Sequence, residues 1–319
     1  MYYLGVNFGR TVITVGVVDE NGEIIIKGSV PTLKYRGIED IVKDIATLCI
    51  RVVNNAKLNI DKDIVSIGIA ITGIPDKKDG TIVYSSYFDY HTVQVKSILK
   101  QYINLPIYIE NDANCYGLAE SRWGAAKGFK NSVTVNIGQG VGAGIIVDGK
   151  IYNGAFSGAG ELGHHVIVVD GEPCHCGRRG CWECYASEDA LIRDAKILSI
   201  KYPKSEIFKM VNGDFRVMSY NTPFEAAKMG DKYAVELINK YIKYMAVGVI
   251  NIANILQPDV IVIGGKVMEQ GEYFLDSLKN EVEKHHYGDH LSNTLRAPEI
   301  KLSQIGYDAI IMGAAMLRE

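Results

Sequence analysis

Hydrophobic residues along the chain follow two spacings, one typical of helices and one typical of strands. In residues 38–56 they recur every three or four positions, which predicts a helix with one buried face. Residues 241–256 are apolar nearly all round and predict a buried helix. Short runs rich in β-branched residues predict buried strands, which begin at Ile64, Pro106 and Val260. This alternation of strands and helices predicts an α/β protein.

The first glycine-bearing turn of the chain has a second copy. Residues 4–19, LGVNFGRTVITVGVVD, align without a gap on residues 133–148, VTVNIGQGVGAGIIVD, and six of the sixteen positions are identical. Asn7 matches Asn136, and Gly9 matches Gly138. Each copy has the strand-turn-strand pattern of a hairpin. Two unrelated hairpins that contain glycine can also look alike. We interpret the pair as an internal duplication and expect two similar lobes.

A duplicated glycine turn suggests a kind of ligand. Backbone N–H groups beside glycine are free of side-chain bulk and can approach phosphate oxygens closely. We therefore expect the two turns to line one nucleotide cleft between the lobes.

Composition and charge narrow the partners and the location. Hydrophobic residues make up 47% of the chain and charged residues 22%, as in a globular protein. The net charge of −3 lacks the positive surplus of a nucleic-acid-binding domain. The first residues lack the pattern of a secretion signal, and no apolar run has the length of a membrane span. We expect a cytoplasmic protein without nucleic-acid or membrane partners.

Four of the six cysteines lie within eleven positions, and they are Cys174, Cys176, Cys181 and Cys184. Without a secretion signal, such a cluster favours a metal site over a disulfide framework. Thiolates and imidazoles suit zinc, and four protein ligands make the site structural. The spacing leaves the fourth ligand open among His164, His165, His175 and Cys184. We expect the zinc site to hold the neighbouring carboxylates, Glu161 and Glu183, in fixed places.

Asn111 and Asp112 stand between a predicted strand and a predicted helix. Open α/β sheets bind ligands at this end of their strands. Asp112 therefore has two interpretations: it caps the helix, or it accepts a proton from a substrate hydroxyl as a general base. Taken alone, the position favours the cap.

Several motifs together resemble those of the ROK family (repressors, open reading frames and sugar kinases). GELGHH followed by CHCGRRGCWE is similar to the family signature. The other motifs follow in family order, and they are ITGIPD from Ile71, IENDAN from Ile109, GQGVGAGII from Gly138, PDVIVIGG from Pro258 and IGYDAIIMGAA from Ile305. The resemblance implies the two-lobed, actin-like hexokinase (ASKHA) fold. It divides the chain into an N-terminal lobe of residues 1–120, completed by a helix in residues 305–319, and a zinc-containing lobe of residues 121–304.

The resemblance also implies individual roles. It makes Asp112 the general base that accepts the sugar hydroxyl proton. The implied zinc ligands are His164, Cys174, Cys176 and Cys181, which leaves Cys184 outside the site. The implied sugar ligands are Gly73, Asn111, Glu161, His164 and Glu183. The implied nucleotide ligands are Asn7, Gly9, Thr11, Gly138, Gly140, Gly264 and Gly265.

The nucleotide motifs depart from those of the kinases in this family. The first turn is usually Asp-x-Gly-Gly-Thr-Lys, whose Asp helps to hold Mg²⁺. Here residues 7–12 read Asn-Phe-Gly-Arg-Thr-Val. Gln139 stands where Thr is usual, and Lys266 stands where a further Gly is common. Arg10 and Lys266 would either attract phosphates or obstruct the cleft.

Two functions follow from the resemblance. One is an ATP- and Mg²⁺-dependent kinase of glucose or a related hexose, which Asp112 favours. The other is a non-catalytic sugar sensor akin to the family's repressors, which Asn7 and Gln139 favour. The first turn begins so near residue 4 that no N-terminal helix-turn-helix domain is expected. The family commonly forms dimers, so we expect a homodimer.

Overall fold

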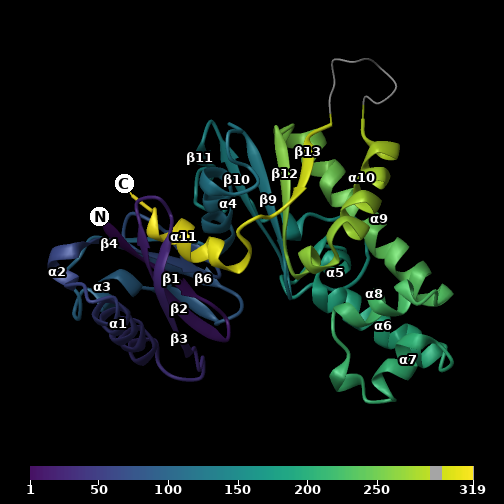
Figure 1. Cartoon of the computed structure of the whole chain (residues 1–319), viewed down its shortest axis with the longest axis horizontal. Coiled ribbons are helices and arrows are strands. Elements are labelled where there is room, and N and C mark those ends of the chain that lie inside the picture. The colour runs from purple at the N-terminus through teal and green to yellow at the C-terminus, as the bar shows by residue number, and fades with distance from the viewer. Residues whose placement is uncertain (288–296, 319) are drawn as a thin grey trace. The chain divides into compact units, whose positions relative to one another are not determined.

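A computed structural model describes residues 1–287 and 297–318 (Figure 1). The chain forms two compact units. Unit 1 contains Met1–Lys130, Gly144–Gly160 and Gln304–Glu319, and unit 2 contains Asn131–Ala143 and Glu161–Ser303. Glu319, the last residue of the expected closing segment, lies outside the described residues. The lobe boundary at residue 120 stays a prediction.

The first five-stranded sheet contains the first copy of the duplicated sequence. Its strands are β1 (Tyr2–Phe8), β2 (Val12–Asp19), β3 (Ile24–Pro31), β4 (Ile64–Ile71) and β8 (Ile107–Asn111), in the order β3-β2-β1-β4-β8. The first three strands are antiparallel neighbours, whereas β4 pairs in parallel with both β1 and β8. The strands predicted to begin at Ile64 and Pro106 are therefore confirmed, the second starting one residue later.

The second five-stranded sheet repeats this topology. Its strands are β9 (Ser132–Ile137), β10 (Val141–Val147), β11 (Lys150–Ile151), β12 (Val260–Gly265) and β13 (Glu299–Leu302), in the order β11-β10-β9-β12-β13. As in the first sheet, three consecutive strands are followed by two parallel ones. The matching order confirms the duplicated strand-turn-strand units.

A short C-terminal helix closes on the first sheet. α11 (Ala309–Ala315) packs against β1, β4 and α4 (Asp112–Trp123), as Figure 1 shows. A Cβ at Gly5 would collide with the carbonyl of Ile311, and one at Gly68 with that of Ala314. Glycines on two neighbouring strands therefore let the helix backbone lie directly on the sheet.

The remaining elements of unit 1 surround this sheet. α1 (Ile38–Asn55) packs against β2 and β3, and it buries its apolar face as its spacing predicts. The other helices of the unit are α2 (Ile60–Asp63) and α3 (Val95–Leu99). A small antiparallel sheet contains β5 (Ile74–Asp76), β6 (Thr81–Ser85) and β7 (Tyr90–Val93).

Unit 2 contains a longer helix than the sequence predicts, and Val247 and Ile255 on it are exposed rather than buried. α9 spans Lys232–Leu256, so the helix predicted from residue 241 begins nine residues earlier. Its start depends on a cap, because Oδ1 of Asp231 accepts bonds from the amides of Tyr233 (2.8 Å) and Ala234 (3.0 Å). The other helices of the unit are α5 (Glu183–Ala186), α6 (Glu188–Lys201), α7 (Glu206–Val211), α8 (Asn221–Lys228) and α10 (Gly271–His285).

Within the described ranges, no helix combines the length and the apolar character needed to cross a bilayer.

Candidate active site and metal centre

The junction between β8 and α4 presents the candidate general base. Asn111, not Asp112, is the cap of α4: its Oδ1 accepts bonds from the amides of Ala113 (2.9 Å) and Asn114 (3.2 Å). Asn111 Nδ2 donates to the carbonyl of Gly73 at 3.0 Å, so the structure brings these two predicted sugar ligands together. Since Asn111 does the capping, the Asp112 side chain is available for another role.

The Asp112 carboxylate is half-buried and held at both oxygens. Its Oδ2 accepts a bond from Oγ1 of Thr72 at 2.8 Å, and its Oδ1 accepts one from the amide of Ala113 at 2.8 Å. Burial raises the pKa of Asp112 above its usual value, although these bonds and the positive charge of Arg10 oppose the rise. A carboxylate whose pKa lies nearer neutrality is a stronger base than an ordinary aspartate.

An ion pair between a buried glutamate and an exposed lysine adjoins this junction. Glu110, fully buried at the end of β8, pairs with Lys77. Its Oε1 accepts bonds from the amide of Asn111 at 2.8 Å and from Nδ2 of Asn114 at 3.0 Å. Neither charged residue was among the expected site residues, although a glutamate inside an apolar strand is itself a signal, because buried charges need partners.

Thr32, which was not among the expected site residues, holds the first glycine turn by two hydrogen bonds. Thr32 Oγ1 donates to the carbonyl of Gly9 at 2.8 Å, and the Thr32 amide donates to the carbonyl of Thr11 at 2.9 Å. Arg10 lies over the ring of Tyr87, with its guanidinium carbon 4.9 Å from the ring centre. Asn7, the last but one residue of β1, is half-buried, and Thr11 is exposed. The turn is thus fixed in shape, and Arg10 is its one charged residue.

The second and third glycine turns leave neighbouring strands. β9 and β12 pair in parallel with Asn136 opposite Gly264, so Gly138, Gly140, Gly264 and Gly265 all lie at the same sheet edge. Gly265 has φ 89°, a left-handed conformation suited to glycine. The Gly138 carbonyl accepts a 2.9 Å bond from the amide of Glu188. Burial raises the pKa of Glu188, and the positive charge of Lys266 opposes this rise. Lys266 directly follows Gly265, the last residue of β12, and so lies at this sheet edge.

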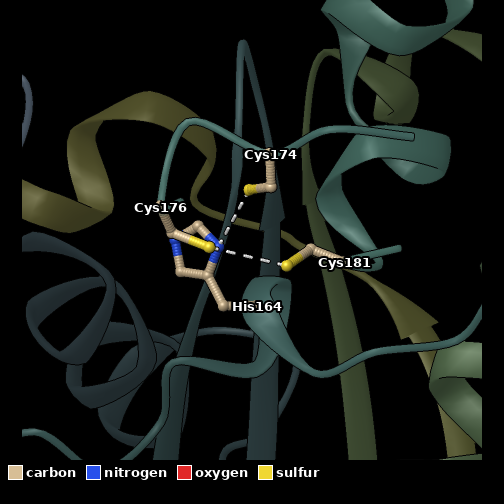
Figure 2. Close-up of side chains that lie close together, drawn as sticks. All are labelled: His164, Cys174, Cys176 and Cys181. Carbon is tan, nitrogen blue, oxygen red and sulfur yellow. Dashed lines mark hydrogen bonds between the residues drawn. The ribbon is translucent and has the colours of Figure 1, made fainter. Parts of the chain in front are cut away.

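Three cysteines and one histidine converge in unit 2 (Figure 2). The candidate ligand atoms of His164, Cys174, Cys176 and Cys181 all lie within 4.8 Å of one another. Nδ1 of His164 lies 3.6 Å from Sγ of Cys174, and the other two sulfur atoms are 3.6 Å apart. Three thiols with one imidazole form a donor set typical of structural zinc.

The local backbone explains how the cysteine segment closes. Gly177 and Gly180 have φ 86° and 77°, values that allow the reversal predicted between the cysteines. Burial raises the pKa of Cys176, but hydrogen bonds from Arg178 and the neighbouring thiols lower it to about 7. A thiol with such a pKa is readily deprotonated, as metal ligation requires.

The other candidates for the fourth ligand have different partners. Nδ1 of His165 contacts the carbonyl of Leu162. Cys184 Sγ donates to the carbonyl of Pro173 at 3.5 Å. His175 points to Glu183, with Nδ1 3.1 Å from Oε1. Of the four, only His164 lies among the three cysteines.

The predicted sugar ligands of unit 2 lie beside this cluster. Glu161 is exposed, and its carbonyl accepts a 3.0 Å bond from the amide of His164. Glu183 is buried at the start of α5, where its Oε2 accepts a 2.9 Å bond from the amide of Val141. His164, His175 and Glu183 each offer a ligand atom within 4.8 Å of the others. The structure therefore groups two predicted sugar ligands with His175, which the sequence indicated only as a candidate metal ligand.

The sequence model of the ROK family matches residues 3–319, and the chain belongs to this family. The relatives include the glucokinase of Streptomyces coelicolor, 31% identical over 98% of this chain and 96% of that protein. They also include the xylose repressor of Bacillus subtilis, 29% identical over 99% of this chain and 76% of that protein.

A solved structure agrees with this assignment. The ROK family glucokinase from Streptomyces griseus, in complex with glucose and AMPPNP, matches with a TM-score of 0.83 and 30% identity. The match covers 99% of this chain and 98% of that one. The fold is therefore the two-lobed, actin-like ASKHA fold expected from the sequence.

Proposed function

We propose that the protein is an ATP-dependent kinase of a hexose, glucose or a close relative, with Asp112 as the general base. The observation that carries this proposal is the half-buried Asp112 carboxylate, held by Thr72 and Ala113 while Asn111 caps the helix. The likeness to glucokinases over nearly the whole chain supports the substrate class.

The proposed reaction begins with proton removal. Asp112 accepts the proton of a sugar hydroxyl while that oxygen attacks the γ-phosphorus of ATP, and the bridging oxygen leaves with ADP. General-base assistance of this kind is worth roughly 10²–10⁴-fold in rate. Positioning and charge stabilisation supply most of the remaining acceleration in phosphoryl transfer.

The same proposal assigns the sugar ligands. They are Gly73, Asn111, Glu161, His164 and Glu183. One N–H of the Asn111 amide bonds to Gly73, which leaves its second N–H for a sugar hydroxyl. Glu183 and His164 lie on or beside the metal cluster, which limits their movement and suits discrimination between sugar epimers.

The nucleotide phosphates are assigned to the glycine turns. The proposed ligands are Asn7, Gly9, Thr11, Gly138, Gly140, Gly264 and Gly265. The Mg²⁺ that accompanies ATP would neutralise part of the phosphate charge. Asn7 would offer this ion one uncharged side-chain oxygen. Zinc in the cluster of His164, Cys174, Cys176 and Cys181 supplies a cross-link, because four protein ligands leave no open position.

The proposal also covers the lobe boundaries, the cellular location and the oligomeric state. The N-terminal lobe comprises residues 1–120 with 305–319, and the zinc-containing lobe comprises residues 121–304. The protein acts in the cytoplasm, and it forms a homodimer.

The alternative is a sugar sensor without kinase activity. Asn7 and Gln139 favour it, because both positions depart from the usual kinase turns, and the likeness to a xylose repressor supports it. ADP release measured over a panel of hexoses, together with calorimetric sugar binding, separates the two. Turnover on a hexose supports the kinase, whereas binding without turnover on any sugar supports the sensor.

A further inference from the structure

His175 stands between two of the cysteines and takes part in a second convergence of side chains. Its Nδ1 lies 3.1 Å from Oε1 of Glu183, and its ring meets the ring of His164 edge-on with the centres 5.3 Å apart. It is not among the four residues that converge as metal ligands. Its backbone is nevertheless held on both sides, by Cys174 and Cys176.

Glu183 is fixed at both of its oxygens. Oε2 accepts a hydrogen bond from the Val141 amide at 2.9 Å, and Oε1 lies 3.1 Å from Nδ1 of His175, an ion-pair contact. The Val141 backbone also packs against the turn that carries His164, because a Cβ at Gly163 would collide with the carbonyl of Val141. The backbone of Val141, in β10, thus bonds to Glu183 and also packs against the turn that carries His164.

We propose that His175 is a positioning residue that fixes the Glu183 carboxylate and thereby determines which hydroxyl configuration the sugar site accepts. The proposal rests on the proposed function, because it takes Glu183 as a sugar ligand. It adds a residue that determines specificity within that site.

The physical reason lies in the number of anchors. A carboxylate anchored at one oxygen turns about its last bond and adapts to hydroxyls in different positions. With His175 and Val141 holding opposite oxygens, the remaining lone pairs of Glu183 point in fixed directions. A hydroxyl of the wrong configuration then leaves a buried acceptor without its partner, which penalises the wrong epimer.

Sugar binding to the intact protein without ATP tests this proposal. Glucose, mannose and galactose are titrated calorimetrically into the parent and into His175→Ala. His175→Asn serves as the conservative variant, because its amide nitrogen can replace Nδ1 as donor. His91→Ala is the matched control, since His91 is likewise an exposed histidine beside a carboxylate, at 3.7 Å from Asp89. The metal content of every variant is measured in parallel.

We expect His175→Ala to reduce the ratio of dissociation constants between the disfavoured and favoured sugars by about tenfold, the effect of losing one polar contact to a charged group. His175→Asn should restore most of this ratio. The control should match the parent, and the metal content should stay constant in all variants.

Two results would overturn the proposal. One is an unchanged ratio in His175→Ala. The other is an equal loss of affinity for every sugar together with loss of metal, which would make His175 a support of the metal cluster instead. A parent that binds hexoses without turning them over contradicts the kinase and leaves this test intact, whereas a parent that binds none contradicts both proposals.

Discussion

Thr72 Oγ1 donates a 2.8 Å hydrogen bond to Oδ2 of Asp112, directly after the ends of the parallel strands β4 and β8. Forty positions separate the two residues in the sequence. The bond stabilises the charged form of the carboxylate and so opposes the rise in pKa that burial causes. It therefore influences the pH range in which Asp112 can act as a base.

Replacing Thr72 tests this relationship. Thr72→Val keeps the shape but removes the donor, so the pKa of Asp112 rises further and the acid limb of kcat/KM moves to higher pH. At pH 6 we expect kcat/KM to fall by roughly tenfold, the value of one bond to a charged group. Thr72→Ser keeps the hydroxyl and serves as the control. An acid limb that stays in place or moves to lower pH contradicts the assignment.

The neutral residue in the first turn leads to a second prediction. Asn7→Asp adds a charged oxygen, which Mg²⁺ prefers to an amide oxygen. In the kinase, the Mg²⁺ concentration at half-maximal activity should fall roughly tenfold, because ligand charge sets affinity for hard cations. Asn280→Asp on the exposed face of α10 is the control. An activity that is unchanged or lower in Asn7→Asp would count against a site that merely lacks one charge.

Replacing Arg10 tests whether the first turn attracts phosphate. It is the one charged residue of the turn, and its charge acts on Asp112. Arg10→Ala should raise the KM for ATP about tenfold, because a charge-assisted contact is lost, while Arg10→Lys should retain much of the affinity. Steady-state kinetics with varied ATP measures this. A lower KM in Arg10→Ala would show that the side chain obstructs the nucleotide instead.

The metal cluster gives a matched pair of cysteine variants. We expect about one zinc per chain in the untagged protein, since four ligand atoms converge on one point. Cys176→Ser should lose the metal and lower the Tm by more than about 5 °C, because metal binding is coupled to folding. Cys184→Ser should keep both, since Cys184 bonds to the carbonyl of Pro173. Metal analysis that finds no zinc in the parent would contradict the cluster.

Much of the architecture follows from local patterns in the sequence. The apolar spacing of α1, the duplicated hairpins and the buried strands all depend on residues close together in the chain. The nine extra residues at the start of α9 were missed because they depend on the cap at Asp231 rather than on a fully apolar surface.

The site was less predictable because its contacts join distant segments. Thr32, Thr72 and Lys77 support candidate residues far away in the sequence, and no local pattern identifies such pairs. The cysteine spacing predicted three metal ligands, but adjacent His164 and His165 differ only in the direction that one short turn gives them. The spacing alone could not choose between these histidines.

Formation of a hexose phosphate by the parent and by Asp112→Asn tests whether the protein is a kinase with Asp112 as its general base. The product is followed by mass spectrometry with ATP, Mg²⁺ and each hexose in turn, and Asp89→Asn is the exposed control. We expect a hexose phosphate with the parent and with the control. In Asp112→Asn we expect a rate lower by roughly 10²–10⁴-fold. No phosphorylated sugar from any hexose, or an equal rate in Asp112→Asn, would contradict the proposed function.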